Sequence, residues 1–386
     1  MGLKIEFVER ASAGASVSEL CRELGISRQT GHKWLRRYRE SGYEGLEEQS
    51  RRPKTAPLAT AEDIVLSILE LREAHPRWGA GKLVHLLRRR FGAGAPSERT
   101  IVRILERAGR IRKRVRRRGL SLVERAPEVV AKAPNDVWTI DFKGWWRVAD
   151  GQRCEPLTVR DAFSRFVLTV SLLERNNEEH VRKVLQRLFL KHGVPSAIQC
   201  DNGSPFISVK ARAGLTKLSV WWVSLGIRVV RSRVGCPQDN GAHERMHADI
   251  AADLQHAPER TKARQQRSCD RWRQVFNHVR PHAALGGKTP AEFFRSQPLN
   301  KLPVRTPMYP AAWTVRRVSA SGHIGVDGQR IFVSEALANQ TVGLQLSAGL
   351  RWKVWFHDLD LGAIELLAPD TPIPTKRKLA FSKHVA

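Results

Sequence analysis

The spacing of apolar residues predicts two helical units in the first part of the chain. In residues 1–50, apolar side chains recur at the intervals of packed helices, and Gly25 lies where a tight turn between two helices requires a positive φ. Ser27 is suited to cap the helix that follows this turn. A Pro-containing linker, residues 51–60, separates this unit from a second helical stretch over residues 61–109.

The second helical stretch divides into three predicted helices. The first ends at His75, because Pro76 disfavours helical backbone at the residue before it. A leucine-rich second helix follows, and Ser97 can cap the third. The order of helices and turns in both units is typical of helix-turn-helix modules, so the pattern indicates two all-α modules in tandem.

From about residue 135, short apolar runs rich in β-branched residues alternate with helical patterns. The predicted strands are residues 137–140, 156–159, 166–173, 197–200 and 227–230. The predicted helices are residues 177–192, about 206–225 and about 239–256. Three strands before the first helix indicate antiparallel pairing, and the later alternation indicates parallel pairing. We therefore expect an α/β domain with a mixed sheet and helices on its faces.

The remaining sequence predicts a basic helix over residues 259–276 and a small β domain. Short alternating strands with Gly-containing turns in residues 312–367 are typical of a small barrel or sandwich. The predicted domains are helix-turn-helix units at 1–52 and 60–110, a basic linker at 111–134, the α/β core at 135–257, a basic helical extension at 258–300, a small β-barrel-like domain at 307–370 and a disordered tail at 371–386.

The charge of the chain indicates the kind of partner. The 386 residues include 66 Lys and Arg against 38 Asp and Glu, a formal net charge of +28. Such a field attracts polyanions, with nucleic acid the first candidate and an anionic membrane the second. No stretch reaches the roughly 18 consecutive apolar residues that span a bilayer. The five cysteines contain no C-x-x-C pair, and we expect a soluble, cytoplasmic protein with reduced thiols.

Basic side chains are predicted on the surfaces that would face DNA. The helix after Gly25 would enter the major groove as the second helix of a helix-turn-helix. Its predicted exposed residues are Arg28, Gln29, His32, Lys33, Arg36 and Arg37. The third helix of the second unit is predicted to expose Arg99, Arg103 and Arg107. The run at 110–118 predicts an arm that contacts phosphates through Arg112, Arg114, Arg116 and Arg117. The alternative for each is a solvated charged surface.

Three acids occupy matching places in the predicted α/β domain. Asp141 ends the first strand, Asp201 ends a later strand, and Glu244 lies in the first turns of the last helix. Magnesium prefers hard oxygen ligands, and two such ions can hold one phosphodiester between them. Three clustered carboxylates without a cation would repel one another. The pattern therefore predicts a catalytic metal site.

Other residues offer competing interpretations. Residues 243–247 read H-E-x-x-H, a zinc-protease pattern, but a protease explains neither Asp141 and Asp201 nor the charge. His243 and His247 are interpreted instead as DNA-facing or packing residues. Among the other acids, Asp161 is predicted to be a structural hydrogen-bond partner, and Asp239 is predicted to cap a helix. Asp249 is predicted to point away from the helix face that carries Glu244. His282 could position a phosphate or water, or could be a capping or core residue. Trp145 and Trp146 could line a DNA path, although sheet packing is favoured.

The motifs taken together resemble a known family. They are WTIDFKG (138–144), DAFSR (161–165), QCDNGSPF (199–206), PQDNGAHERMH (237–247) and NHVRPHAAL (277–285). In this order they resemble the catalytic core of bacterial insertion-sequence DDE transposases of the retroviral-integrase type. The helix-turn-helix pair, the basic arm and the C-terminal β domain are similar to that family as well, so the resemblance covers nearly the whole chain.

The resemblance implies a fold and an activity. It implies an RNase H-like integrase core, a D-D-E triad of Asp141, Asp201 and Glu244, and two Mg²⁺ or Mn²⁺ ions. It also implies binding to the terminal inverted repeats of a mobile element, strand cleavage, and strand transfer by a 3′-hydroxyl. Partners would be double-stranded DNA, at the element ends and the target, and further copies of the chain, on the bacterial nucleoid. The alternatives are a helix-turn-helix regulator without catalysis and an inactive element protein.

Overall fold

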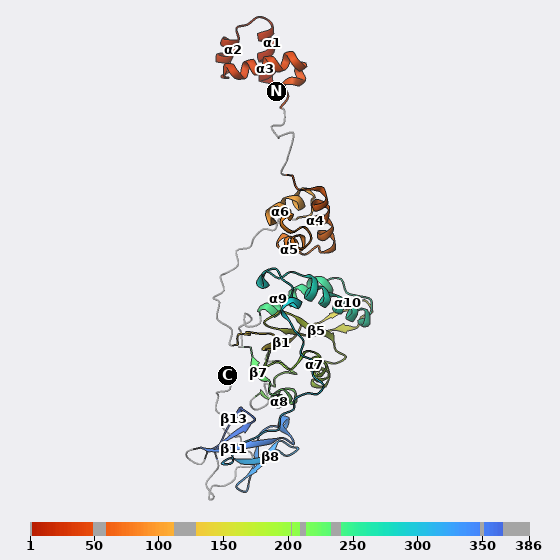
Figure 1. Ribbon diagram of the computed structural model, residues 1–386, viewed down its shortest axis with the longest axis vertical. Coiled ribbons are helices and arrows are strands. Elements are labelled where there is room, and N and C mark those ends of the chain that lie inside the picture. Colours follow the sequence, from red (N-terminus) through yellow and green to blue (C-terminus); the bar gives the residue numbers. More distant parts are fainter. Residues whose placement is uncertain are drawn as a thin grey trace. The chain divides into compact units, whose positions relative to one another are not determined.

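The structure is a computed structural model, and it describes residues 2–48, 59–111, 129–201, 203–208, 214–232, 241–347 and 351–365. The chain divides into two compact units, Met1–Glu62 and Asp63–Ala386. Figure 1 labels the helices and strands of both units along the chain. The described residues include no helix that is long and apolar enough to cross a membrane.

The first unit is a small bundle of three helices: α1 (Gly2–Ser12), α2 (Val17–Glu23) and α3 (Arg28–Ser41), with a 3₁₀ turn at Gly42–Leu46. Gly25 adopts a φ of 63° between α2 and α3, as the sequence predicts. The side chain of Ser27 accepts a hydrogen bond from the Thr30 amide and so caps α3. Phe7, Leu20 and Leu35 are buried at the centre of the bundle.

The second unit begins with another three-helix arrangement: α4 (Glu62–Ala74), α5 (Ala80–Phe91) and α6 (Glu98–Arg107). The predicted break at His75-Pro76 is confirmed, since α4 ends at Ala74. Ser97 caps α6 by accepting a hydrogen bond from the Thr100 amide. The buried residues shared by these helices are Ile68, Leu83, Leu87, Ile101 and Leu105.

A five-stranded mixed sheet forms the centre of the second unit, with strand order β5-β4-β1-β6-β7. Its strands are β1 (Val137–Phe142), β4 (Pro156–Asp161), β5 (Val167–Leu172), β6 (Ala197–Cys200) and β7 (Arg228–Arg231). The first three strands pair antiparallel, and β6 and β7 extend the sheet in parallel from β1. The predicted mixed sheet is therefore confirmed.

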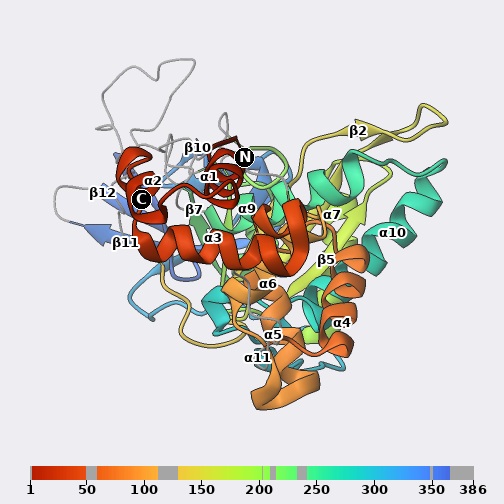
Figure 2. The same ribbon diagram turned by 90° about the horizontal axis from the view of Figure 1, so that it is seen from above.

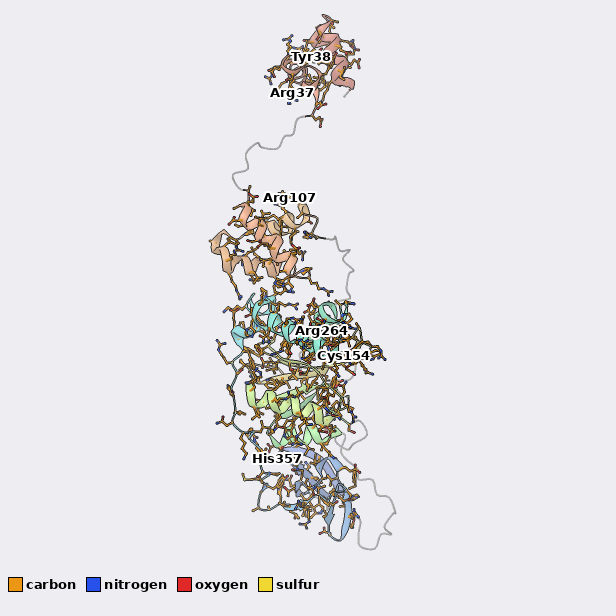
Figure 3. The ribbon with its side chains drawn as sticks, turned by 90° about the vertical axis from the view of Figure 1, so that its right-hand side faces the viewer. Arg37, Tyr38, Arg107, Cys154, Arg264 and His357 are labelled. Atoms are coloured by element: carbon orange, nitrogen blue, oxygen red, sulfur yellow. The ribbon has the colours of Figure 1, made fainter. Side chains whose placement is uncertain are left out.

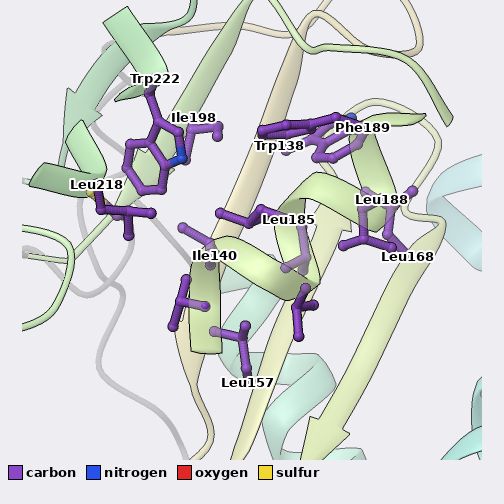
Figure 4. Close-up of a cluster of buried hydrophobic side chains, with 14 of the residues drawn as sticks. Trp138, Ile140, Leu157, Leu168, Leu185, Leu188, Phe189, Ile198, Leu218 and Trp222 are labelled. Carbon is purple, nitrogen blue, oxygen red and sulfur yellow. The ribbon is translucent and has the colours of Figure 1, made fainter. Parts of the chain in front are cut away.

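One face of the sheet packs against α7 (Glu178–His192) and α8 (Lys217–Ser224). Trp138 of β1, Phe189 of α7 and Trp222 of α8 are fully buried in this layer (Figure 4). The prediction of a helix from about residue 206 was wrong in its first part, because α8 begins at Lys217. Phe206 and Ile207 are buried, but the chain forms a turn at Ser204–Phe206 and not a helix. Residues 209–213 lie outside the described part of the chain.

The other face of the sheet is covered by α9 (Gly241–Ile250) and α10 (Lys262–Gln274), each followed by a π-helical turn, at Ala251–Gln255 and Val275–Val279. A short hairpin of β2 (Trp146–Arg147) and β3 (Arg153–Cys154) shares their core. The sequence did not predict this hairpin, because strands of two residues are too short to show an alternating pattern. A final short helix, α11 (Pro290–Phe293), has a capping box at Thr289.

Two side-chain amides form hydrogen bonds with the backbone groups at the free edge of the sheet, on β5. Asn277 accepts a hydrogen bond from the Val167 amide and donates one to the Val167 carbonyl, both at 2.8 Å. Further along the strand, Gln266 accepts a hydrogen bond from the Leu172 amide at 2.8 Å and donates one to the Val170 carbonyl at 2.9 Å. These bonds fix α10 and its π-helical turn along an edge that would otherwise present unpaired backbone groups.

The C-terminal part is all-β, as the sequence predicts, and its strands form two separate sheets in the described residues. One has the order β13-β12-β11-β8 and the other pairs β10 with β9. The strands are β8 (Thr314–Arg317), β9 (His323–Val326), β10 (Gln329–Phe332), β11 (Thr341–Ser347), β12 (Arg351–Phe356) and β13 (Leu359–Glu365). Residues of both sheets share one core, including Val326, Leu344 and Phe356. The predicted disordered tail lies outside the described residues.

Candidate active site

Asp141 and Asp201 lie at the carboxyl ends of two adjacent parallel strands. The register of β1 and β6 pairs Ile140 with Cys200, so the next residue on each strand is an acid. Neighbouring strands are about 4.8 Å apart, which places the two carboxylates at the same edge of the sheet. The Asp201 carboxylate accepts a hydrogen bond from the Gly203 amide at 3.1 Å.

Glu244 is exposed in the first turn of α9, and its neighbour His243 fixes that turn to the sheet. His243 is fully buried, with Nδ1 2.7 Å from the hydroxyl of Thr139 and Nε2 2.7 Å from the hydroxyl of Thr158. Thr139 and Thr158 come from the neighbouring strands β1 and β4. One imidazole therefore connects the helix that carries Glu244 to two strands, including the one that carries Asp141.

A buried arginine provides a second connection to the same turn. Arg160 of β4 is only 4% exposed, and its guanidinium donates to the Ala242 carbonyl at 2.6 Å. Burial lowers the pKa of Arg160 to about 10, so the side chain stays charged at neutral pH. Ala242 lies two positions before Glu244, so this hydrogen bond restrains the start of α9 against β4.

Thr139, Thr158 and Arg160 were missed by the sequence interpretation. Each is a buried polar residue in a largely apolar strand segment. Their partners on α9 are distant along the chain, so the sequence contains no local signal for the contacts.

The electrostatics of the site show that the charges of Asp201 and Glu244 act on Asp141. The pKa of Asp141 is raised to about 7, first by burial of the carboxyl group and next by the negative charge of Asp201, with a smaller contribution from Glu244. The Asp141 side chain is 24% exposed. Three carboxylates in one electrostatic field, one of them largely desolvated, fit a divalent cation, which would relieve the repulsion.

We expect Asp141 to contribute less to the stability of the metal-free protein as the pH rises from about 4 to about 7. The pKa of Asp141 is 3.8 in an unperturbed chain and about 7 in the folded protein. Between these values the folded state retains a proton on Asp141 that the unfolded state has lost, so the contribution of this group to the free energy of unfolding falls with rising pH. Mg²⁺ would offset this loss of stability only at pH values at which the Asp141 carboxylate is ionised. Thermal unfolding should therefore show a larger Mg²⁺-induced increase at about pH 8 than at about pH 5.

The control for this prediction is Asp141→Asn, which removes the titrating group. Its increase in melting temperature with Mg²⁺ should be smaller and nearly independent of pH. An equal increase at both pH values in the unaltered protein contradicts the prediction.

His247 lies against the sheet, next to Thr158 of β4 and Asp141 of β1. Its Nε2 is 2.8 Å from the Thr158 hydroxyl, and its Nδ1 is 3.9 Å from a carboxylate oxygen of Asp141. Burial lowers its pKa to about 3, so the ring is neutral at physiological pH. Ligand atoms of Asp141, His243 and His247 lie within 4.8 Å of one another. Both nitrogens of His243 already contact threonine hydroxyls, however, so the buried pair is better described as packing residues than as zinc ligands.

The structure also locates the other acids considered from the sequence. Asp161 is fully buried and accepts bonds from the Asn135 amide and from the amide and hydroxyl of Ser164, which confirms a structural role. Asp249 pairs with Arg280 at 2.6 Å. Asp239 lies outside the described residues. His282 packs against the Phe276 ring, with a pKa lowered to about 3 chiefly by burial.

The predicted DNA-binding side chains that the structure describes are exposed, except for Arg37, which is partly buried. On α3 these are Arg28, Gln29, His32, Lys33 and Arg36. On α6 they are Arg99, Arg103 and Arg107, and Figure 3 labels Arg107 at the end of that helix. Arg112, Arg114, Arg116 and Arg117 lie outside the described residues. The two tryptophans after Asp141 differ, since Trp146 is 5% exposed and Trp145 is 52% exposed.

The chain matches protein families over most of its helical and central parts. Residues 3–54 match the Helix-turn-helix domain family, and residues 30–105 match the Homeodomain-like domain family. Residues 131–237 and residues 225–290 match two families described as Integrase core domain.

Two bacterial proteins are similar to this chain. The insertion element IS407 uncharacterized 31.7 kDa protein of Burkholderia multivorans is 30% identical over 234 residues, which cover 60% of this chain and 80% of that protein. The insertion element IS476 uncharacterized 39.2 kDa protein of Xanthomonas euvesicatoria is 27% identical over 292 residues, which cover 74% of this chain and 81% of that protein.

Solved integrase structures are similar at a lower level. The HTLV-2 integrase catalytic core domain in complex with magnesium is 19% identical with a TM-score of 0.32, covering 43% of this chain and all of that one. The simian T-cell lymphotropic virus intasome chain is 17% identical with a TM-score of 0.36, covering 78% of this chain and 99% of that one. TM-scores of this size support no conclusion about function.

The mixed sheet and the integrase-core matches define an enzyme of the DDE transposase/integrase class, which acts on DNA. The chain belongs to the family of insertion-sequence transposases that carry helix-turn-helix domains and an integrase core. Members of the integrase-core family depend on divalent metal ions, and the three acids offer the oxygen ligands such ions prefer.

Proposed function

We propose that this protein binds the terminal inverted repeats of a mobile element and cleaves and transfers DNA strands through Asp141, Asp201 and Glu244. The observation that carries the proposal is the register of β1 and β6, because it sets Asp141 and Asp201 side by side at one edge of the sheet. The charge of Glu244 acts on the same carboxyl group of Asp141, which supports its place as the third acid.

In this proposal the three carboxylates hold two Mg²⁺ ions, with Mn²⁺ able to replace them. Bound metal would activate the attacking oxygen and stabilise the leaving oxygen of a phosphodiester. The chain's own residues position the ligands. Asp141 and Asp201 are fixed by the sheet, and Glu244 is oriented by the contacts of His243 and Arg160. His247, neutral beside Asp141, adds no positive charge that would compete with a cation.

DNA recognition is assigned to the helix-turn-helix units. The exposed basic faces of α3 and α6 would contact the element ends, and the arm containing Arg112, Arg114, Arg116 and Arg117 would contact phosphates. The exposure of the α3 and α6 side chains supports this assignment. Joining two element ends requires two sites, so the protein would act as a homo-oligomer on double-stranded DNA, associated with the bacterial nucleoid.

The test uses the full chain and DNA that carries the inverted repeats flanking its gene. Labelled duplexes with these ends should be nicked in Mg²⁺ or Mn²⁺ and remain intact in EDTA, and products with a free 3′-hydroxyl should be joined to a second duplex. Duplexes with scrambled ends are the control. Tight binding to the ends without cleavage in either metal overturns the proposed activity and favours a helix-turn-helix regulator.

A further inference from the structure

The β2–β3 hairpin has two chemically different faces. Trp146, Val148 and Cys154 point inward and are buried. Trp145, Arg147 and Arg153 are exposed, and they alternate with the buried residues as neighbours on a β-strand do. A tryptophan that is 52% exposed is a large apolar surface left in water. The inward face explains how the hairpin is held to the core, whereas the contacts described for the outward face are made within the hairpin and its flanking residue Glu155.

The hairpin is held firmly beside the candidate active site. It follows β1 directly, with Lys143 and Gly144 between the strand and Trp145. Its buried residues share a core with Met246 and Ile250 of α9, the helix that carries Glu244. Backbone bonds join its tip to the segment before α10, from the amides of Ala149 and Asp150. In Figure 2 the hairpin projects from the core on the side of α10, and Figure 3 labels Cys154 there.

The exposed face combines an aromatic ring with two guanidinium groups. The guanidinium carbon of Arg153 lies 4.9 Å from the centroid of the Trp145 ring, and that of Arg147 lies 5.8 Å away. Arg147 donates to the Gly151 carbonyl at 2.7 Å, and Arg153 pairs with Glu155 at 2.8 Å. These bonds restrain both cations over the ring, and Trp145 remains 52% exposed. A planar π-surface flanked by fixed cations is complementary to a nucleotide, whose base stacks and whose phosphate is anionic.

We propose that Trp145, Arg147 and Arg153 form a platform for an unpaired DNA base close to the strand end held by the three acids. Trp145 stacks on the base, and the two arginines contact the adjoining phosphates. The base is unpaired because a ring on the protein surface cannot reach the face of a base stacked inside a duplex. The net charge of +28 and the chain's membership of a DNA-acting enzyme family favour DNA over a protein partner. The inference rests on the proposed function of the acids.

The experiment compares two DNA probes with the same element end, one blunt and one with a short single-stranded overhang. The dissociation constants of the full chain are measured for both by fluorescence anisotropy. Trp145→Ala should weaken binding to the overhang probe about 5- to 150-fold, which is the range for loss of one base–aromatic stack. The dissociation constant for the blunt probe should change little. Trp145→Phe should retain most of the affinity, because a smaller ring still stacks.

Leu346→Ala is the matched control, since Leu346 is 57% exposed on β11 in the C-terminal region. Equal melting temperatures would show that each variant is folded. Trp145→Ala with unaltered overhang binding overturns the inference, as does a wild-type protein that does not prefer the overhang. If Trp145→Ala abolishes self-association but not DNA binding, the platform binds a second copy instead. In all three cases metal-dependent cleavage by the wild type would persist, whereas its absence would reject the proposed function itself.

Discussion

Asp141→Asn is expected to lower the rate of DNA strand cleavage by at least about 10³-fold while leaving the fold intact. Metal-bound charge stabilisation contributes several kcal/mol to phosphodiester chemistry, and each 1.36 kcal/mol is a tenfold change in rate. An amide matches the shape of the carboxylate but lacks its charge, so it holds a divalent cation poorly. Single-turnover cleavage of a labelled element end in Mg²⁺ measures the effect.

A second readout separates loss of catalysis from loss of folding. In metal-free solution at neutral pH the Asn variant should be at least as stable as the unaltered protein, because the buried charge near Asp201 and Glu244 is gone. The matched control is Glu174→Gln, whose side chain is 89% exposed and should leave the rate unchanged. Cleavage by Asp141→Asn within tenfold of the wild-type rate would remove Asp141 from the proposed triad.

His243→Ala is expected to reduce both stability and catalysis. The substitution removes a fully buried ring and its contacts with Thr139 and Thr158, leaving a cavity and weakly satisfied hydroxyl groups. A cost of about 3 kcal/mol in the free energy of unfolding follows from these two effects. Because His243 holds the turn that carries Glu244, cleavage should also slow by about 10²-fold, the effect of a misplacement near 1 Å.

Urea unfolding followed by tryptophan fluorescence measures the stability change, since Trp138 and Trp222 report on the core of the sheet. His180→Ala is the control, because His180 lies on α7 and contacts only nearby Asn177 and Glu174 in the bonds described. A zinc-selective chelator should leave the stability of the wild type unchanged. A fall in stability with the chelator would instead support the H-E-x-x-H zinc interpretation.

The sequence predicted the parts of the fold in which burial dictates composition. Strands β1 and β6 are largely buried on both faces, so each is a short and mostly apolar run, and Asp141 and Asp201 stand out because they interrupt or follow such runs. The caps at Ser27 and Ser97 were predictable for a similar reason, since capping depends only on residues three positions away.

Features that depend on distant contacts could not be predicted in this way. Thr139, Thr158 and Arg160 form their contacts only when α9 lies over β1 and β4. Their partners on α9 are about 80 to 100 residues away along the chain. The start of α8 was misplaced because Phe206 and Ile207 are apolar residues ahead of the helix, although the chain turns at Ser204–Phe206 and α8 begins only at Lys217. The roles of Asp141, Asp201 and Glu244 and of the basic faces of α3 and α6 remain predictions.

The anchoring of α9 has a consequence for how the enzyme loses activity. In the proposed triad, Asp141 lies on β1 and Asp201 directly follows β6, so both should keep their places until the sheet unfolds. Glu244 depends on a single helical turn held by one imidazole and one guanidinium. Opening of that turn is a local event with a lower free energy than global unfolding. We therefore expect inactivation on heating to be set by the α9 contacts and to precede the melting of the sheet.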